Sequence, residues 1–321
     1  MTALRISIAG ALALATPQVV PLPIVCKCGK APENPLQVAQ LRWYEANEAA
    51  AFGVGLGPRG IAFDGDHMWV AIAGGNSVYK IRASDGHVMG VYATGSEPWY
   101  LAFDGASMWV ANRSDDTVSK IRCSDGALLG TFPVGDGPQG VAFDGKYIWV
   151  ANTDSGTLTK LQASDGALVQ TVSVRSQPWD LAFDGRNIWV AQNGHSSVAK
   201  VRASDGIVLL ESVIAQNVID VVFDGANLWA VNNSSDTVTK LRPGDGAVLG
   251  VYAVGDAPES LIFDGTYIWV ANHLGDNVTK LRADNGAVVG TFSAGDGAYR
   301  MAFDGSNVWV TNHFSNTVSK M

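Results

Sequence analysis

The stretch FDGDHMWVA, residues 63–71, decides the fold because it returns along the chain at a constant interval. The FDG triplet recurs every 40 residues without slippage, and a tryptophan stands four residues after the glycine of each triplet. The seven aspartates of the triplet are Asp64, Asp104, Asp144, Asp184, Asp224, Asp264 and Asp304. An unbroken period of this length is typical of repeat proteins, in which each unit is one supersecondary structure.

A single unit, residues 98–137, contains four short apolar segments separated by turn residues. These segments cover residues 99–103, 108–112, 117–122 and 128–134. Their length and their β-branched and aromatic residues predict β-strands, and none is long enough for a helix. Four strands in about 40 residues are typical of one propeller blade. The sequence therefore predicts an all-β fold, a seven-bladed β-propeller with four antiparallel strands per blade.

The two ends of the repeat region are complementary. The sequence stops in the third-strand position of the seventh unit, whereas residues 49–55 fill a fourth-strand position. We therefore expect residues 49–55 to form a strand beside residues 317–321 and close the ring. Residues 38–42 match a third-strand position, so a closure with two strands from each end stays open. The predicted propeller covers residues 38–321, and residues 1–37 are a signal-like and spacer segment.

Residues 1–15 resemble a short secretory signal. Arg5 precedes an apolar run, and Ala13 and Ala15 are spaced as they are before a cleavage site. The apolar run is too short to span a bilayer. We expect an extracytoplasmic protein, periplasmic or secreted, without a membrane span; an uncleaved apolar tail is the alternative.

The composition argues against one class of partner. Charged residues make up 16% of the chain, and the net charge is −8 with a pI near 5.0. A nucleic-acid-binding surface normally needs clustered Lys and Arg, so we expect no nucleic-acid partner. One lysine recurs in the third strand of each unit, and we expect a solvated ring of lysines that discourages edge pairing. The seven are Lys80, Lys120, Lys160, Lys200, Lys240, Lys280 and Lys320.

Positions that vary within an otherwise faithful repeat are the candidates for function. The two residues after the first position of each first strand vary widely in chemical type, and we call them the entrance positions. A propeller gathers them around one mouth of its central channel. The candidate ligand-binding residues there are Arg59, Trp99, Tyr100, Trp179, Asp180, Asp220, Glu259, Tyr299 and Arg300.

This mixture of rings and charges suits a polar ligand with flat apolar faces, such as a small molecule or a glycan. We expect an exposed rim, on which Trp99 and Trp179 face a flat ligand from different sides. Asp180 and Asp220 set like charges near each other, and this repulsion needs a cation, a donor-rich ligand or Arg300 to offset it. An ordinary solvated funnel is the alternative.

The turns between second and third strands add two histidines to the same face. His273 and His313 occupy equivalent positions of adjacent units, so we expect them to approach each other and to contact a ligand. No carboxylate is placed to complete a metal site, and we predict neither a metal nor a cofactor. The repeated aspartate suggests calcium or catalysis, but we interpret it as a turn residue that accepts hydrogen bonds from nearby backbone N–H groups.

The repeat signature FDGxxxWVAN…TVxKxRxSDGxxxGxFxVG, over residues 38–321, resembles bacterial propeller proteins of the YVTN and virginiamycin B lyase-like type. The resemblance implies the fold, but propellers serve many functions. The lyase family has a catalytic histidine after the proline that begins a first strand, and a metal-binding glutamate near the end of a second strand. Here Arg59, Trp99, Gln139, Trp179 and Glu259 follow those prolines, and most second strands end in asparagine. The resemblance therefore implies no catalytic residue in this chain.

The predicted function is that of a non-enzymatic binding or interaction module. We expect a monomer that recognises a small molecule, a glycan or a protein at the channel mouth. An enzyme of the lyase or lactonase type is one alternative. A purely structural surface repeat without a ligand is another.

Overall fold

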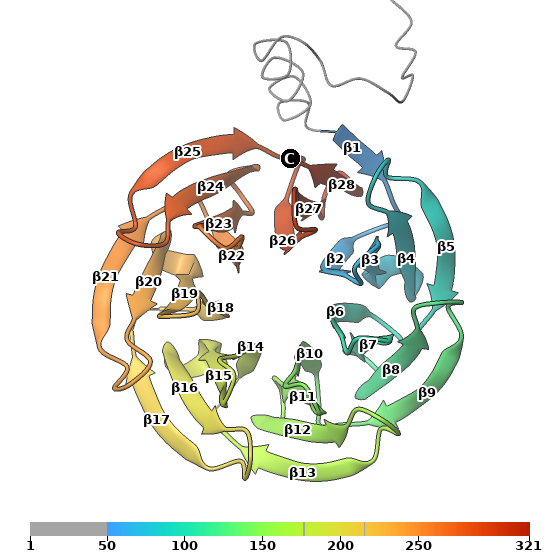
Figure 1. Ribbon diagram of the computed structural model, residues 1–321, viewed down its shortest axis with the longest axis horizontal. Coiled ribbons are helices and arrows are strands. Elements are labelled where there is room, and N and C mark those ends of the chain that lie inside the picture. Colours follow the sequence, from blue (N-terminus) through green and yellow to red (C-terminus); the bar gives the residue numbers. More distant parts are fainter. Residues whose placement is uncertain (1–49, 176, 215) are drawn as a thin grey trace, which may run out of the picture. The chain divides into compact units, whose positions relative to one another are not determined.

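The computed structural model describes residues 50–321 except residues 176 and 215. These residues form seven four-stranded antiparallel sheets, arranged as the blades of a ring (Figure 1). The predicted all-β, seven-bladed propeller is confirmed. The expectations for residues 1–37 and 38–42 lie outside the described residues. Within the described part of the chain, no helix has the length and apolar character needed to cross a membrane.

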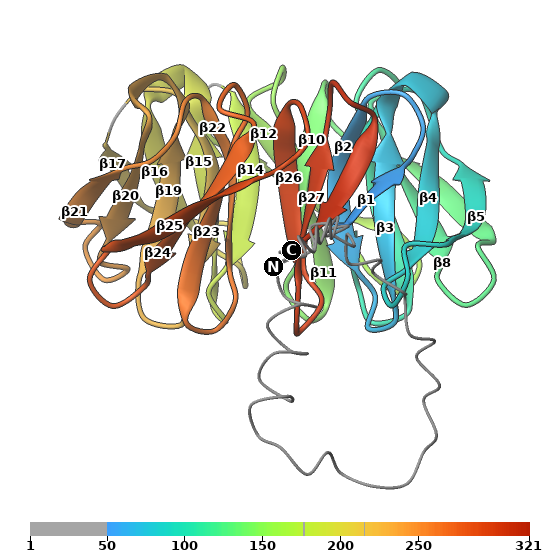
Figure 2. The ribbon, with the colours of Figure 1, turned by 90° about the horizontal axis from the view of Figure 1, so that it is seen from above.

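Each blade places its strands in chain order from the channel outward, and Figure 2 shows them running between the two faces of the ring. The innermost strands are β2 (Pro58–Phe63), β6 (Pro98–Phe103), β10 (Pro138–Phe143), β14 (Pro178–Phe183), β18 (Val218–Phe223), β22 (Pro258–Phe263) and β26 (Ala298–Phe303). The second strands are β3 (His67–Ile72), β7 (Ser107–Asn112), β11 (Tyr147–Asn152), β15 (Asn187–Gln192), β19 (Leu228–Asn232), β23 (Tyr267–Asn272) and β27 (Val308–Asn312).

The third strands are β4 (Ser77–Arg82), β8 (Thr117–Arg122), β12 (Thr157–Gln162), β16 (Ser197–Arg202), β20 (Thr237–Leu241), β24 (Asn277–Arg282) and β28 (Thr317–Lys320). The outer strands are β5 (Val88–Ala93), β9 (Leu128–Pro133), β13 (Leu168–Ser173), β17 (Val208–Val213), β21 (Val248–Ala253), β25 (Val288–Ser293) and β1 (Ala50–Gly53). Three short 3-10 helices lie in turns between second and third strands: η1 (Ala73–Gly75), η2 (Asn193–His195) and η3 (Asn233–Ser235).

The seventh blade closes the ring with strands from both ends of the chain. Its order is β1-β28-β27-β26, and Ala50 to Gly53 pair antiparallel with Lys320 to Thr317. Phe52 in β1 stacks on Trp309, with ring centroids 5.7 Å apart. The predicted closure, with three strands from one end and one from the other, is confirmed. The blades are numbered 1 to 7 from β2–β5 onward, so β26, β27, β28 and β1 form blade 7.

The repeated aspartate organises the turn between first and second strands. In blade 2, Asp104 Oδ1 accepts hydrogen bonds from the backbone N–H groups of Ala106 and Ser107, at 2.9 and 2.7 Å. Asp104 Oδ2 accepts a third bond from Trp109 Nε1, at 2.7 Å. The turn also needs Gly105, whose φ of 98° is costly for a residue with a Cβ. The interpretation as a turn residue is confirmed, and the same bonds recur in each blade.

The hydrophobic core lies between blades. Trp69 of blade 1 is fully buried, and it packs in one cluster with Leu101 and Met108 of blade 2. On the side away from the channel, Tyr92 of β5 stacks on the same indole ring, at a centroid distance of 5.5 Å. Each repeated tryptophan therefore joins its own blade to the next.

The repeated lysines do not form a solvated ring, so that prediction was wrong. Lys160 is 2% exposed, and its Nζ donates a hydrogen bond to the backbone carbonyl of Ala203 in the next blade, at 2.6 Å. The ammonium also lies 4.9 Å from the ring centroid of Trp149, which favours a cation. The aliphatic stem covers the blade interface while the charged end reaches backbone carbonyls. Equivalent bonds to the next blade join Lys80, Lys120, Lys200, Lys240 and Lys320.

Candidate functional site

A β-bulge turns the entrance positions toward the channel mouth. In blade 2, Pro98 pairs with Asn112, but Leu101 pairs with Val110, so Trp99 and the residue after it interrupt the ladder. Bulges redirect side chains and are frequent beside functional sites. The register shifts at the start of each of the other inner strands as well. The repeat therefore brings fourteen variable side-chain positions to one end of the channel.

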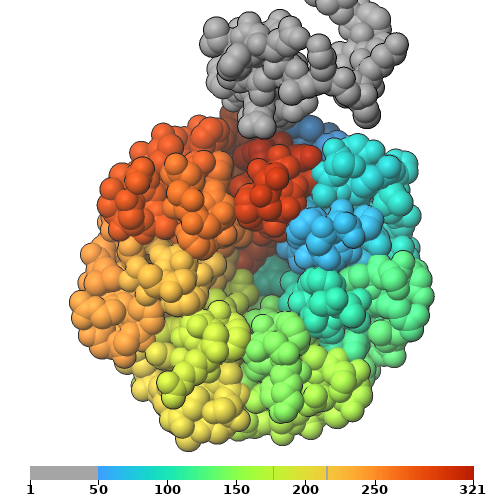
Figure 3. Space-filling view, in the orientation of Figure 1, coloured from blue at the N-terminus to red at the C-terminus, as the bar shows by residue number. Residues whose placement is uncertain are grey.

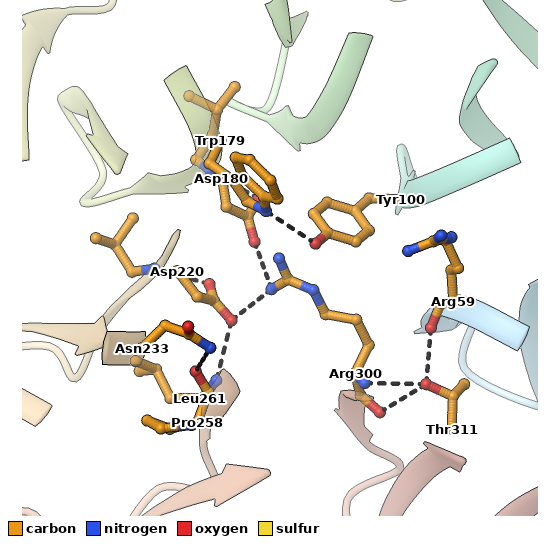
Figure 4. Close-up of polar contacts among 12 residues, drawn as sticks. Arg59, Tyr100, Trp179, Asp180, Asp220, Asn233, Pro258, Leu261, Arg300 and Thr311 are labelled. Carbon is orange, nitrogen blue, oxygen red and sulfur yellow. Dashed lines mark hydrogen bonds and ion pairs between the residues drawn. The ribbon is translucent and has the colours of Figure 1, made fainter. Parts of the chain in front are cut away.

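Arg300 crosses the channel mouth and contacts side chains of three other blades (Figure 4). Its Nη1 lies 2.8 Å from Asp180 Oδ2 in blade 4, and the same atom bonds Asp220 Oδ2 in blade 5. Its Cζ lies 3.7 Å from the ring centroid of Tyr100 in blade 2. Arg300 is 6% exposed, and Asp220 is 3% exposed. The predicted offset of the two aspartate charges by Arg300 is confirmed.

Backbone amides complete the shell around the two aspartates. Asp220 accepts from Val221 N at 2.7 Å and from Leu261 N at 2.9 Å, and Asp180 accepts from Leu181 N at 2.8 Å. Burial raises the pKa of Asp180 well above its usual value; Arg300 opposes this shift, and the Asp220 charge adds to it. Burial alone would lower the pKa of Arg300, but Asp220 above all holds it well above its ordinary value. Arg300 therefore stays charged.

The aromatic entrance residues pack against one another. The rings of Trp99 and Trp179 meet edge to face, with centroids 6.0 Å apart. Trp179 Nε1 donates to the hydroxyl of Tyr100 at 3.3 Å. Arg59 Cζ lies 4.1 Å from the ring centroid of Trp99, and its Nη1 donates to the hydroxyl of Tyr299 at 3.1 Å. These contacts link blades 1, 2, 4 and 7.

The expectation of an exposed rim was therefore wrong for much of this set. Trp99 is only 8% exposed, and the other buried members are Tyr100, Asp220, Tyr299 and Arg300. The expectation that Trp99 and Trp179 face a ligand from different sides was also wrong, because the two rings contact each other. The physical reason is the narrow ring of inner strands, which brings large side chains from opposite blades within contact distance. Arg59, Trp179, Asp180 and Glu259 are half-buried.

Glu259 and the two histidines complete the mouth. Glu259 Oε1 accepts a hydrogen bond from Asn233 Nδ2 at 3.3 Å, and burial raises the pKa of Glu259 to about 7, against the opposing charges of Arg300 and Arg59. The rings of His273 and His313 lie 6.3 Å apart, so their expected approach is confirmed.

Burial lowers the pKa of both histidines, and the Arg59 charge acts in the same direction. His313 Nδ1 lies 3.3 Å from the backbone carbonyl of Pro58, and Phe314 packs on the ring of His273 at 4.7 Å. Within residues 50–321, apart from 176 and 215, no three His, Cys, Asp or Glu side chains form a group that could hold a metal ion.

A cavity of about 190 Å³ lies in the channel beside the Arg300 cluster. The space-filling view shows the ring hollowed at its centre (Figure 3). Tyr100, Asp180, Asp220, Ser260 and Arg300 supply the polar side chains of the wall. Most of the remaining wall is aliphatic, and it consists of Gly60, Ile61, Leu101, Val141, Leu181, Val221, Leu261, Ile262 and Met301.

Several buried polar atoms of the mouth have no hydrogen-bond partner in the described part of the chain. They are Nε and Nη2 of Arg300, both amide atoms of Gln139, Nε of Arg59 and Nδ1 of His273. Gln139 is completely buried at an entrance position of blade 3. A buried donor or acceptor without a partner costs about 1–3 kcal/mol. Such groups are rare in native proteins, so their concentration at one mouth indicates unused binding capacity.

Sequence reasoning missed three residues that shape the site. Gln139 was not among the candidates, Asn233 holds Glu259, and Thr311 Oγ1 donates to the carbonyl of Arg59 at 2.7 Å (Figure 4). Thr311 Oγ1 also accepts from Arg300 N at 2.9 Å. A signal for Thr311 was present, because five other units carry alanine at this position, at Ala71, Ala111, Ala151, Ala191 and Ala271.

No protein-family model and no curated protein matches this sequence. Two solved structures share the architecture. Hydrazine synthase of Kuenenia stuttgartiensis superposes with a TM-score of 0.71 at 21% identity, covering 83% of this chain and 95% of that chain. A streptogramin B lyase superposes with a TM-score of 0.73 at 16% identity, covering 85% of this chain and 96% of that one. At these identities the likeness is one of fold, and the chain is a propeller of the virginiamycin B lyase-like architecture.

Proposed function

We propose that this protein is a non-enzymatic binding module that takes its ligand at the channel mouth. The observation that supports this most is the set of unpartnered buried atoms on Arg300 and Gln139. Packing alone would favour apolar side chains at such positions, because the polar atoms lose their hydration and gain no partner. A ligand that supplies those partners recovers the lost interactions.

Two other functions have observations in their favour. Glu259 has a pKa near neutrality, as general acids and bases do, and this supports an enzyme of the lyase or lactonase type. However, no histidine–glutamate pair lies in the arrangement of the lyase family. The contacts among Trp99, Tyr100 and Trp179 support a purely structural plug. Unpartnered donors are a cost in a plug and a resource in a binding site.

The decisive experiment is a ligand screen with a variant that separates the readings. The full-length protein is screened against small molecules and glycans by thermal shift, and hits are measured by calorimetry. Gln139→Leu removes both unpartnered amide atoms. If Gln139 serves a ligand, this variant raises the Tm of the free protein and weakens binding. Gln162→Leu, at the far end of the same blade, is the matched control and leaves binding unchanged.

The possible outcomes distinguish the three functions. Saturable binding that Gln139→Leu weakens supports the binding module. Turnover of a bound lactone or cyclic ester, lost in Glu259→Gln, supports the enzyme. Absence of any hit, together with the increased stability of Gln139→Leu, contradicts the proposed function and leaves the structural plug.

The proposed module works outside the cytoplasm and as a monomer. The signal-like pattern of residues 1–15 supports the location, although these residues lie outside the described part of the chain. Cell fractionation with an antibody to the propeller checks the first statement. Light scattering of the purified full-length chain checks the second.

A further inference from the structure

Arg300 presents a second hydrogen-bonding edge that its ion pairs do not use. Both aspartates bond to Nη1, whereas Nε and Nη2 have no partner in the described part of the chain. In Figure 4, Arg300 meets both aspartates through one terminal nitrogen, and no dashed line reaches the other terminal nitrogen or Nε. In a guanidinium, the Nε–H and one Nη2–H point the same way from one edge of the plane. They form a fork that matches two oxygens of one acceptor group.

Another arginine of the same chain shows what this fork binds. Arg282 Nε donates to Asp284 Oδ1 at 3.1 Å, and Arg282 Nη2 donates to Asp284 Oδ2 at 3.1 Å. The two parallel bonds hold one carboxylate. That pair is exposed to solvent, whereas Arg300 is buried and lines a cavity. The free fork of Arg300 therefore has the geometry for a carboxylate from outside the chain.

The charges around the fork permit an anion. Asp220 accepts two backbone N–H groups besides Arg300, and Asp180 accepts one, so both carboxylates are stabilised on the side away from the fork. Burial raises the pKa of Asp180 and of Glu259, which reduces the negative charge nearby as these groups take up protons. Arg59, at the same mouth, adds a second positive charge.

The cavity beside Arg300 selects the rest of the ligand. Its volume of about 190 Å³ exceeds the space of about 10–15 Å³ that one water molecule needs. Leu181, Val221 and Met301 are representative of its wall, which is mostly aliphatic. A short hydrocarbon chain fits this wall, because it gains by leaving water. A second charged group would have no partner there.

We propose that the mouth binds a short-chain aliphatic monocarboxylate. Its carboxylate occupies the Nε–Nη2 fork of Arg300, and its hydrocarbon tail occupies the cavity in the channel. This inference rests on the proposed binding function and names the ligand class.

The test begins with the full-length wild-type protein. Acetate, butyrate and hexanoate are titrated while arginine side-chain Nε–H resonances are followed by NMR, with calorimetry for affinity. The expected result is saturable binding that strengthens from acetate to butyrate and shifts one Nε–H resonance. Butyramide and 1-butanol, which lack the charged pair of oxygens, bind at least about tenfold more weakly. No saturation by any carboxylate, the result if solvent alone occupies the fork, overturns the proposal.

Variants then locate the bound acid. Arg300→Lys keeps the charge but removes the fork, so binding falls about tenfold or more. Arg282→Lys, which removes the exposed fork, leaves binding unchanged. If Arg300→Lys does not fold, Ser260→Tyr fills the cavity at a position whose counterpart in blade 2 is Tyr100, and it abolishes binding of butyrate. Unchanged affinity in Ser260→Tyr or in folded Arg300→Lys overturns the proposal.

The outcomes separate this inference from the proposed function. If carboxylates do not bind but a different hit from the screen is weakened by Gln139→Leu, the binding function stands and the ligand class is wrong. If nothing binds, both are wrong.

Discussion

At the scale of single residues, the FDG aspartate shows how one side chain serves both a turn and the core. Its Oδ1 holds the turn between the first and second strands, and its Oδ2 satisfies the indole N–H of a buried tryptophan. A buried Trp109 without this acceptor would keep an unpaired donor. The repeat therefore retains aspartate together with tryptophan.

Asp104→Asn tests this double role. The amide oxygen can still accept the turn hydrogen bonds, but the amide NH₂ would face Trp109 Nε1 donor to donor. We expect a loss of about 1–3 kcal/mol in the free energy of unfolding, because the buried indole N–H is left without an acceptor. Urea denaturation measures it. Asp205→Asn, in an exposed turn, is the control, and an equal loss in both variants would show that the indole bond is unimportant.

Glu259 predicts a pH-dependent stability with an unusual sign. Its pKa rises from 4.5 in an unstructured chain to about 7 in the folded protein, so the folded state binds more protons between these values. Stability therefore falls as pH rises from about 4.5 to 7, and stays lower above that range. Glu259→Gln removes this penalty. We expect the variant to be more stable than the wild type at pH 8, by up to about 3 kcal/mol, and equally stable near pH 4.

Thermal melts from pH 4 to 8 check the prediction for Glu259. Glu97 provides a control of opposite sign: burial alone would raise its pKa, but hydrogen bonds from Ser114 and Trp99 outweigh burial and lower the pKa. Glu97→Gln should therefore lower the Tm at pH 8. A Glu259→Gln variant no more stable than the wild type at pH 8 would show that the carboxyl is well solvated.

Residue environments were the hardest property to predict from the sequence. Lys160 is repeated and charged, which indicated solvent, yet its Nζ bonds to Ala203 in the next blade. Arg300 and Trp99 vary within the repeat, which correctly marked them as special, but not as buried. Burial here depends on the distance between blades across a narrow channel. A pattern read along one chain contains no such distance.

At the scale of elements, the closing blade depends on one short strand. β1 is the outer strand of blade 7, and Phe52 places its ring on Trp309. A Cβ on Gly86 would lie 2.1 Å from the same ring, so Phe52 also covers the turn of blade 1. β1 thus fastens blade 7 to blade 1.

Phe52→Ala should weaken this fastening. We expect a loss of about 3–5 kcal/mol in the free energy of unfolding, as for a buried phenylalanine. Phe132→Ala is the matched variant, because Phe132 packs on Trp109 in the same way within blade 2. Limited proteolysis separates the two: cleavage near Ala50–Gly53 should accelerate only in Phe52→Ala. Equal cleavage in both would contradict a special role of β1 in closure.

The elements themselves were predictable because local signals agreed with the global period. Asp-Gly turns every 40 residues, short β-branched segments and the Pro133 position each indicated the same four-stranded unit, and β9 does lie at the outer edge. The closure was predictable from complementary strand positions at the two ends. The bulges at the entrance positions were not, because they arise from pairing with the second strand.

At the scale of the whole molecule, the FDG turns make stability sensitive to acid. Burial alone would raise the pKa of Asp64, Asp184 and Asp304, but hydrogen bonds outweigh burial and lower it. A carboxylate with a depressed folded pKa stabilises above its unfolded pKa, and that stability is lost as pH falls through the folded value. The same bonded turn recurs in every blade, so the effects accumulate around the ring.

We therefore expect the Tm to fall steeply below about pH 4, the ordinary range of aspartate. Calorimetry from pH 6 down to pH 3 measures this. Asp184→Asn should flatten part of the slope, because it removes one titrating group. A Tm that stays constant to pH 3 would show that the turn carboxylates do not support the fold.

The side chain of Arg300 has a mechanical consequence for the ring. Blades that touch only their neighbours can each slide slightly, and the ring can become oval without breaking any single interface. Arg300 starts in blade 7 and meets side chains of blades 2, 4 and 5, so it works like the spokes of a wheel. The mouth end is braced against such distortion. The bore is therefore stiffest at the end where its diameter decides what enters.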